Sequence, residues 1–294
     1  MRILILGGDG MLGHQLFLHL RENHEVKVTL KKNLSLYSNI DLFDYENSYF
    51  GVDALNHFDL IKIFSDFMPE IVINAIGIIK QRCASDNVYL SLQINSLLPH
   101  RLLVLCKLIK SKLIHFSTDC VFSGLKGNYT EEDLPDAQDV YGRTKILGEV
   151  VEGNCLTLRV SIVGLELFNK RSLIEWFLQQ RGEISGFANA IYTGISNIEI
   201  ARIIEHILVF YPKLCGLFHI ASEKISKYDL LCRLYKALNK KNIKIRSNDK
   251  MFCDRSLVDK KFHDIVDYKI LGWNDMLSEL AMLIKKRDDI IKYR

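Results

Sequence analysis

Three side chains suited to proton transfer lie near one another in the middle of the sequence: Thr118, Tyr141 and Lys145. If residues 140–152 form a helix, Tyr141 and Lys145 are one turn apart and share a face of it. A tyrosine hydroxyl normally titrates near ~10, and a cation one turn away would favour the phenolate and lower that pKa. Such a pair can donate or accept a proton in alcohol–ketone chemistry, while the Thr118 hydroxyl holds the substrate oxygen. The alternative is a solvated tyrosine and lysine on a surface helix.

A glycine-rich turn near the start of the chain is a candidate site for binding an anion. The apolar run of residues 2–6 is followed by Gly7, Gly10 and Gly13 and then by a helical pattern of apolar residues. Because glycine lacks a Cβ atom, the backbone can turn sharply and approach a pyrophosphate, which the N–H groups at a helix start can bind. The spacing is Gly-x-x-Gly-x-x-Gly, not the Gly-x-Gly-x-x-Gly of the common dinucleotide fingerprint. The alternative is a turn that only joins two elements.

Length and composition fit an intracellular enzyme. The 294 residues suffice for one large α/β unit or two lobes, and 48% apolar with 25% charged residues is ordinary for a globular protein. A net charge of +4 without a dense basic run argues against a nucleic-acid partner. The seven cysteines lack Cys-x-x-Cys spacing, which argues against a zinc site and for a reducing compartment. Without a signal-peptide pattern or an apolar run of membrane-spanning length, we expect a cytoplasmic protein with no membrane partner.

The elements that would position these residues alternate between strand and helix. Strands are predicted at residues 2–6, 25–30, 70–75, 112–117 and 155–160, and helices at 52–67, 88–110 and 140–152. Such alternation predicts an α/β fold with a doubly wound parallel sheet of the Rossmann type. Ligands bind at the carboxyl ends of the strands in these sheets, so Gly7, Asn74 and Thr118 can meet around one ligand. Pro99 must kink the helix at 88–110 or mark a broken start.

The second half of the chain loses this regular alternation. After Ser161 it has polar loops, shorter helices and a late strand near residues 217–220. We therefore predict that residues 1–164, with roughly 190–221, form a dinucleotide-binding Rossmann domain. Residues roughly 165–189 and 222–294 would form a smaller C-terminal lobe.

The residues after the second strand bear on the choice of cofactor. An acidic residue at this position would accept a hydrogen bond from the ribose 2′-hydroxyl of NAD. Lys31 and Lys32 stand there instead. Two cations suit a 2′-phosphate, so we expect NADP(H) in preference to NAD(H). The alternative is that both are ordinary surface lysines.

Several motifs resemble one known family. They are Gly7, Gly10 and Gly13; Asp53 in Gly-Val-Asp-Ala-Leu; Val-Ile-Asn-Ala at 72–75; Asn95 in Ile-Asn-Ser-Leu-Leu-Pro; Phe-Ser-Thr-Asp-Cys-Val-Phe-Ser-Gly at 116–124; Tyr-Thr-Glu-Glu-Asp at 129–133; and Tyr-Gly-Arg-Thr-Lys-Ile-Leu-Gly-Glu at 141–149. With them the chain resembles the extended short-chain dehydrogenase/reductases, and within these the dTDP-4-dehydrorhamnose reductase branch of nucleotide-sugar enzymes. The resemblance covers roughly the whole chain and is sharp to about Arg159.

The resemblance implies a role for each matching residue. Tyr141 would protonate a keto oxygen, Lys145 would lower the pKa of Tyr141 and hold the nicotinamide ribose, and Thr118 would fix the substrate oxygen. Asp53 would bond the adenine, Asn95 would have a structural role, and the C-terminal lobe would bind the nucleotide sugar. The residues expected to bind the cofactor are Gly7, Gly10, Met11, Leu12, Gly13, Lys31, Lys32, Asp53, Asn74, Ala75, Tyr141 and Lys145. No clear set of metal ligands is found.

Two departures from the family bear on the substrate. Cys120 stands where the family commonly has a tyrosine that lines the sugar pocket, and residues 76–82 read Ile-Gly-Ile-Ile-Lys-Gln-Arg, unlike the rhamnose reductases. The second departure points to relatives that act on related 6-deoxy or N-acetylated 4-keto sugars. Lys80, Arg82 and Arg255 would meet a nucleotide diphosphate, the alternatives being solvated cations and a surface ion pair. The expected substrate-binding residues are Lys80, Thr118, Asp119, Cys120, Tyr141 and Arg255, with Tyr-Thr-Gly at 192–194 beside them.

The resemblance leaves more than one function open. The first is NADPH-dependent reduction of a nucleotide-linked 4-keto-6-deoxy sugar for deoxysugar and surface polysaccharide synthesis. The second is a non-catalytic, NADP-binding regulatory subunit of the same fold, and the third is a nucleotide-sugar epimerase. The intact set of Thr118, Tyr141 and Lys145 favours the reductase. The sequence also leaves open whether the protein forms a homodimer.

Overall fold

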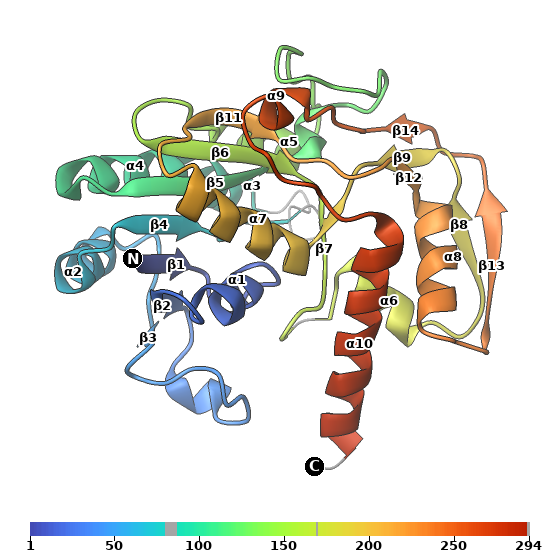
Figure 1. Ribbon diagram of the computed structural model, residues 1–294, viewed down its shortest axis with the longest axis horizontal. Coiled ribbons are helices and arrows are strands. Elements are labelled where there is room, and N and C mark those ends of the chain that lie inside the picture. The colour runs from blue at the N-terminus through green and yellow to red at the C-terminus, as the bar shows by residue number, and fades with distance from the viewer. Residues whose placement is uncertain (80–86, 169, 293–294) are drawn as a thin grey trace.

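A parallel sheet of seven strands forms the centre of the computed structural model, which describes residues 1–79, 87–168 and 170–292 (Figure 1). In spatial order the strands are β11 (Gly216–His219), β6 (Cys155–Val160), β5 (Lys112–Thr118), β4 (Ile71–Asn74), β1 (Arg2–Leu6), β2 (Glu25–Leu30) and β3 (Ser48–Phe50). Every neighbouring pair runs parallel. The predicted α/β class and Rossmann-type sheet are therefore confirmed. The sequence did not predict β3, because its three residues are too few to show a strand pattern.

Helices cover both faces of this sheet, because successive strand residues point to opposite sides. In β1, Ile3 and Ile5 pack on one side with helices α1 (Gly13–Leu20) and α7 (Asn197–Phe210). Leu4 and Leu6 pack on the other side with α2 (His57–Phe67) and α4 (Leu98–Ile109) (Figure 1). Strands buried on both faces need apolar residues at every position, which explains the continuous apolar runs in the sequence.

The order of the strands reverses next to β1. The chain proceeds from β1 to β2 and β3 on one side, and β4, β5, β6 and β11 lie on the other. The ends of β1 and β4 stay together, since the N–H of Ala75 donates to the carbonyl of Leu6 at 3.1 Å. In open parallel sheets the crevice at such a reversal, outside the carboxyl ends of the strands, is where ligands bind. Gly7 and Ala75 flank this crevice.

Helix boundaries differ from the sequence expectation at two places. Helix α2 begins at His57 and not at residue 52, because the Asn56 side chain accepts from Phe58 N at 3.0 Å and caps it there. Helix α5 spans Val140–Leu147 and is followed by Gly148, so it stops short of residue 152.

The expected long helix has three successive parts. They are α3 (Val88–Ser91), the π-helical turn η2 (Leu92–Leu97) and α4. Pro99 lies in the first turn of α4, where its missing N–H is tolerated. Sequence analysis left open a kink or a broken start at Pro99; the structure has a π-helical turn directly before α4 instead of a break in the helix.

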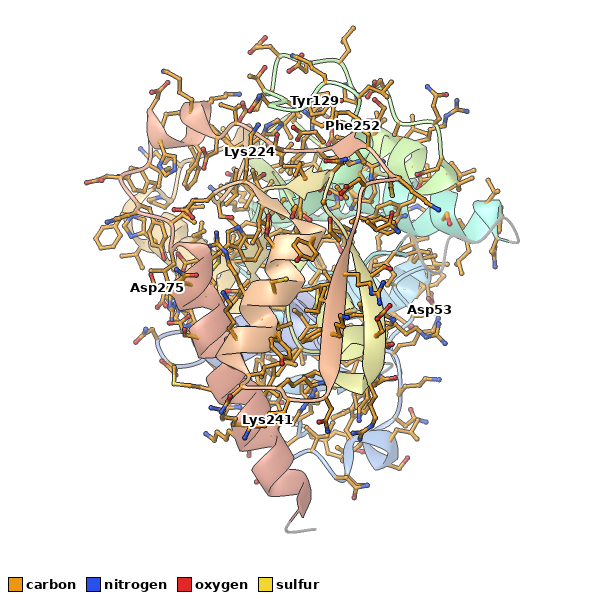
Figure 2. All side chains as sticks on the ribbon, turned by 90° about the vertical axis from the view of Figure 1, so that its right-hand side faces the viewer. Asp53, Tyr129, Lys224, Lys241, Phe252 and Asp275 are labelled. Carbon is orange, nitrogen blue, oxygen red and sulfur yellow. The ribbon has the colours of Figure 1, made fainter. Side chains whose placement is uncertain are left out.

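The remaining strands form small sheets beside the large one. Strand β8 (Gly182–Phe187) pairs with β13 (Ile243–Asn248), β9 (Ala190–Tyr192) lies between β12 (Ile225–Ser226) and β14 (Cys253–Asp254), and β7 (Ile162–Val163) pairs with β10 (Ile195–Ser196). With them lie α6 (Leu173–Gln179), α8 (Lys227–Ala237) and α10 (Trp273–Lys292), whereas α9 (Lys260–His263) contacts β11 of the large sheet. Figure 2 looks onto this side, with Phe252 and Tyr129 towards one end and Lys241 towards the other. The division into two domains at the predicted residues stays a prediction.

The helices also bear on membrane association. Within the described ranges, none of them is both long enough and apolar enough to cross a bilayer.

Candidate functional site

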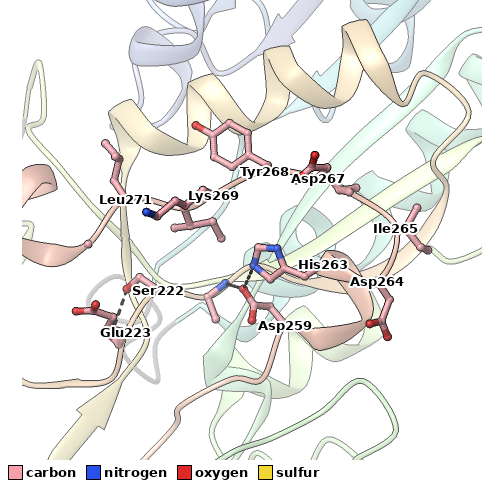
Figure 3. Close-up of a pocket in the computed structure, with 14 residues that line it drawn as sticks. Ser222, Glu223, Asp259, His263, Asp264, Ile265, Asp267, Tyr268, Lys269 and Leu271 are labelled. Atoms are coloured by element: carbon pink, nitrogen blue, oxygen red, sulfur yellow. Dashed lines mark hydrogen bonds and ion pairs between the residues drawn. The ribbon is translucent and has the colours of Figure 1, made fainter.

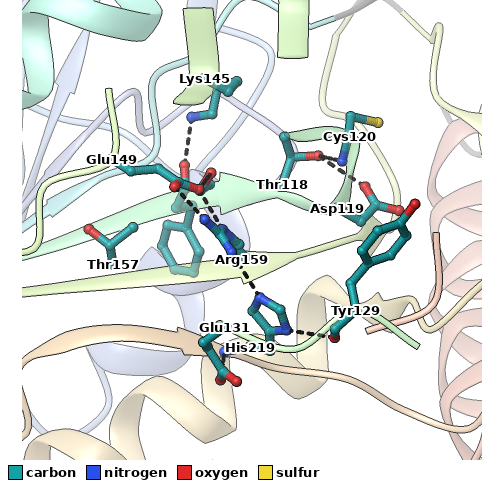
Figure 4. Close-up of polar contacts among 12 residues, drawn as sticks. Thr118, Asp119, Cys120, Tyr129, Glu131, Lys145, Glu149, Thr157, Arg159 and His219 are labelled. Atoms are coloured by element: carbon teal, nitrogen blue, oxygen red, sulfur yellow. Dashed lines mark hydrogen bonds and ion pairs between the residues drawn. The ribbon is translucent and has the colours of Figure 1, made fainter. Parts of the chain in front are cut away.

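The expected catalytic residues gather at the carboxyl edge of the sheet. Thr118 is the last residue of β5, and its hydroxyl accepts from Cys120 N at 3.1 Å and donates to Asp119 Oδ1 at 3.0 Å. Lys145 lies on α5, and its Nζ donates to the main-chain oxygen of Phe116, two residues before Thr118, at 2.6 Å (Figure 4). This bond fixes α5 against the end of β5.

Tyr141 lies in the first turn of α5, one turn before Lys145. The helix begins there because the Asp139 side chain accepts from Gly142 N at 2.7 Å. Tyr141 is half-buried, whereas Lys145 is 5% exposed. The spacing of four residues on a helix therefore holds, and it brings a phenol and a buried amine to one face.

Burial controls the charges at this edge. It lowers the pKa of Lys145 to about 8, and the Glu149 carboxylate opposes that shift. Burial raises the pKa of Asp119, and the Arg255 guanidinium opposes that shift. Lys145 is therefore still mostly protonated at pH 7, as a cation beside a catalytic tyrosine must be.

The glycine turn requires its glycines. Gly7 has a φ of 82°, and the N–H of Gly10 donates to the carbonyl of Gly7 at 3.1 Å. A Cβ atom on Gly13 would lie 2.1 Å from that carbonyl oxygen, and one on Gly8 would lie 2.5 Å from the Cβ of Val28. The cradle therefore has no room for side chains and leads directly into α1, which suits a pyrophosphate at the helix start.

The other expected cofactor residues lie around the same crevice. Ala75 is next to Gly7, and the side chain of Asn74 is directed to His115 Nδ1 at 3.2 Å and accepts from Ile76 N at 3.2 Å. Asn74 thus shapes the crevice through the backbone after β4. The main-chain oxygen of Met11, beside Leu12, accepts from Asn197 Nδ2 at 2.8 Å, which ties the turn to α7.

The residues expected at the adenosine carry charges of both signs. Lys31 and Lys32 directly follow β2 and are exposed, and Asp53 accepts from Leu55 N at 3.0 Å in the turn before α2. Sequence reasoning missed Asp9, whose carboxylate accepts from the buried Tyr37 hydroxyl at 2.8 Å. The position of Asp9 inside the glycine turn is the sequence signal that could have marked it as a residue near the cofactor.

The expected substrate residues come from distant parts of the chain. Arg255 follows β14, and its Nη1 lies 3.8 Å from the Cys120 sulfur while its Nε donates to the carbonyl of Phe122 at 2.8 Å. Arg255, Cys120 and Asp119 are thus brought together beside Thr118. Tyr192 is buried close to Asp119, and burial together with the Asp119 charge raises the pKa of Tyr192. Lys80 and Arg82 lie outside the described residues.

A buried network that the sequence did not reveal lies beneath Lys145 (Figure 4). Arg159 donates two hydrogen bonds to Glu149, from Nε to Oε1 and from Nη2 to Oε2, both at 2.8 Å. Its Nη1 lies 3.2 Å from His219 Nε2, and the main-chain N–H of His219 donates to Glu131 at 2.7 Å. Glu131 therefore accepts a hydrogen bond from the main chain of β11.

Asn95 has the structural role that the resemblance implied. Its side chain bonds the main chain of Ile78 in both directions, at 2.9 and 3.0 Å, and donates to Thr144 Oγ1 at 3.2 Å. It therefore links the segment after β4 to α5. Gly148 completes this contact, because a Cβ atom there would lie 1.8 Å from the carbonyl oxygen of Asn95.

Replacing Gly148 with Ala is therefore expected to destabilise the protein by about 1–3 kcal/mol or more, since the extra methyl group overpacks a backbone contact. The measurement is urea unfolding followed by circular dichroism. Gly272→Ala is the control, because Gly272 also has no positive φ and an added Cβ there would lie 3.8 Å from its nearest neighbour, Glu223 Oε1. Equal losses in the two variants would contradict a packing role for Gly148.

A separate cavity of about 730 Å³ lies away from this set (Figure 3). It is lined by residues 221–223, 259 and 263–272, and none of Thr118, Tyr141 and Lys145 is among them. His263 pairs with Asp259 at 3.1 Å on its wall. Within the described part of the chain, no three His, Cys, Asp or Glu side chains are grouped as metal ligands.

Comparison with known proteins now decides the family. The sequence model of the family described as "RmlD substrate binding domain" matches residues 1–252. The chain belongs to this family. Its fold is that of the extended short-chain dehydrogenase/reductases, so the resemblance predicted from the motifs is confirmed.

Three similar proteins illustrate the range of this fold. Methionine adenosyltransferase 2 subunit beta of Rattus norvegicus is 24% identical over 81% of this chain and 72% of its own length. The dTDP-4-dehydrorhamnose reductase of Aggregatibacter actinomycetemcomitans is 26% identical over 80% of this chain and 78% of its own. The crystal structure of dTDP-4-dehydrorhamnose reductase from Bacillus anthracis in complex with NADP superposes with a TM-score of 0.80 at 19% identity, covering 96% of this chain and 98% of that one.

Proposed function

We propose that this RmlD-family protein is an oxidoreductase that reduces a nucleotide-linked 4-keto-6-deoxy sugar with NADPH. The sugar is dTDP-4-dehydrorhamnose or a related, N-acetylated one, and the product enters deoxysugar or surface polysaccharide synthesis. One observation carries the proposal: Thr118 and the Tyr141–Lys145 pair lie at the same carboxyl edge of the sheet as the glycine turn. The named reductase relative supports it.

The residues divide the reaction between them. The nicotinamide cofactor, when bound, supplies the hydride that adds to the keto carbon. Tyr141 donates the proton that the keto oxygen needs to become a hydroxyl, and the Lys145 ammonium stabilises the phenolate that remains. Thr118 holds the keto oxygen, for which its hydroxyl must turn away from Asp119.

The cofactor would lie across the crevice at the strand reversal. The cradle of Gly7, Gly10 and Gly13 fits a pyrophosphate, with the N–H groups of Met11 and Leu12 at the helix start. Asp53 would bond the adenine, and Lys145 the nicotinamide ribose. The named relative that binds NADP supports a dinucleotide here.

The choice of NADPH over NADH rests on Lys31 and Lys32. Replacing both with Ala is expected to weaken NADPH binding by more than roughly tenfold, since a hydrogen bond to a charged group contributes about 1.5–3 kcal/mol. NADH binding should change little, and fluorescence titration with each cofactor measures both. Equal weakening would mean that the lysines are ordinary surface residues. A variant with the opposite change in charge serves for comparison. Asp9→Asn removes a carboxylate that would repel a 2′-phosphate, so it should strengthen NADPH binding.

The substrate is identified by a screen. NADPH oxidation is followed with nucleotide-linked 4-keto-6-deoxy sugars that differ in base and in N-acetylation, and the product configuration is determined by NMR. A single active sugar, together with the axial or equatorial orientation of the C4 hydroxyl formed in its product, would define the reaction. A changed sugar that forms without net oxidation of NADPH would indicate an epimerase.

A second candidate function is a non-catalytic subunit that binds NADP, favoured by the likeness to methionine adenosyltransferase 2 subunit beta. In that case the protein would bind the cofactor but oxidise no NADPH with any sugar of the screen. The complete set of Thr118, Tyr141 and Lys145 favours the enzyme. For the enzyme we also propose a cytoplasmic location, a homodimer, and substrate binding by the C-terminal lobe with Arg255. Sedimentation tests the homodimer.

A further inference from the structure

Glu149 lies just beyond the end of α5, which stops at Leu147, and its N–H donates to the carbonyl of Ile146 at 3.2 Å. Lys145 and Glu149 bond consecutive residues of β5, because Lys145 Nζ donates to the carbonyl of Phe116 and Ser117 Oγ donates to Glu149 Oε1. The carboxylate therefore lies on the same side of β5 as the lysine (Figure 4).

Three donors from two strands of the central sheet hold this carboxylate. Ser117 Oγ donates to Oε1 at 2.6 Å, and Arg159 donates to both oxygens at 2.8 Å. The side chains of Glu149 and Arg159 are 8% and 3% exposed. Two parallel hydrogen bonds from a guanidinium fix the carboxylate in orientation as well as position.

The far side of Arg159 is held by a neutral histidine. His219 Nδ1 lies 3.2 Å from the carbonyl oxygens of Tyr129 and Val258, so it carries the proton and leaves Nε2 to accept from Arg159. Burial lowers the pKa of His219 to about 4. Arg159 is therefore held between one anion, Glu149, and a neutral imidazole at neutral pH.

Among the described residues, three titratable groups surround Lys145: His115, Tyr141 and Glu149. His115, on β5, is fully buried and its pKa is held well below the ordinary value, so it stays neutral. Tyr141 is the titratable group one turn before the lysine, and Glu149 is the carboxylate whose charge acts on it. The Lys145 ammonium itself donates to a neutral carbonyl, that of Phe116.

We propose that Glu149 is a positioning residue that keeps Lys145 protonated through neutral pH, with Arg159 and Ser117 holding its carboxylate in place. The inference rests on the proposed function only in that Lys145 is taken to hold the cofactor ribose. A charged donor binds a hydroxyl about twice as strongly as a neutral one. Cofactor affinity should therefore decrease as pH rises through the titration of Lys145.

The test is the NADPH dissociation constant, measured by fluorescence from about pH 7 to about pH 10, where the 2′-phosphate no longer titrates. In the natural protein the affinity is expected to fall with a midpoint near pH 8. In Glu149→Gln the midpoint should move down by about one pH unit. The affinity of this variant should therefore already be reduced at about pH 7, where that of the natural protein is still near its maximum. Glu149→Asp keeps the charge and should restore most of the difference.

Glu175→Gln is the matched control, because Glu175 is also buried and accepts from an arginine, Arg287, at 2.5 Å, but on α6. It should lose stability without moving the midpoint. If Glu149→Gln does not fold, the double variant Glu149→Gln/Arg159→Met removes both charges of the pair and should show the same direction of shift.

Two different results would contradict the proposed function and the role of Glu149 separately. A natural protein that binds no NADPH at any pH would overturn the proposed function. A protein that binds NADPH with the same midpoint in the natural form and in Glu149→Gln, or in the double variant, would overturn the role of Glu149 and leave the proposed function standing.

Discussion

Replacement of Tyr141 with Phe is expected to reduce turnover by ~10²–10⁴, because that is the typical contribution of a positioned general acid. The ring and its packing are kept, and only the hydroxyl that donates the proton is lost. The NADPH dissociation constant should therefore stay almost unchanged. Steady-state NADPH oxidation with the best sugar of the screen and a fluorescence titration measure the two quantities.

The structure offers a control for this substitution. Tyr37→Phe also removes a tyrosine hydroxyl, but Tyr37 lies in the turn of residues 34–37 after β2, and its hydroxyl donates to Asp9 beside the glycine turn. It should affect cofactor binding and leave the chemical step intact. A near-normal kcat in Tyr141→Phe would rule out Tyr141 as the proton donor.

Replacement of Lys145 with Met should have two effects at once. Loss of the ammonium removes hydrogen bonds to the cofactor ribose and raises the NADPH dissociation constant. It also removes the cation that favours the Tyr141 phenolate, so the pKa of Tyr141 should rise. Reduction needs the protonated tyrosine, and its rate falls as pH rises through that pKa. The fall should therefore move to higher pH in the variant.

The measurement is NADPH oxidation across pH for the natural protein and for Lys145→Met. An unchanged rate and an unchanged profile would remove Lys145 from the mechanism. A natural protein that is silent with every sugar, while still binding NADPH, would favour the non-catalytic subunit. In that case the substitution would alter cofactor or partner binding only.

Much of the fold could be predicted because its signals are local. The strand patterns at residues 2–6, 25–30 and 155–160 have the same bounds as β1, β2 and β6. Strands covered by helices on both faces are largely apolar, so their composition identifies them without knowledge of their neighbours. The spacing of Tyr141 and Lys145 was equally informative, because four residues on a helix define a face.

Helix ends were less predictable, because a cap is one hydrogen bond and not a pattern. Asp53 and Asn56 are both suitable cap residues, and only the structure shows that Asn56 accepts from the first turn of α2. The end of α5 at Gly148 depends on its contact with Asn95, more than fifty residues earlier.

The sequence by itself therefore determined the fold class, the glycine turn and the set of Thr118, Tyr141 and Lys145. Tertiary structure alone decided that Arg255 reaches Cys120 and that Arg159 pairs with Glu149. These side chains lie on different elements, so their contacts depend on strand order and register, which no local periodicity encodes. The charge environment of Lys145 follows from the same contacts, since burial and a fixed carboxylate arise only when α5 packs on β5 and β6.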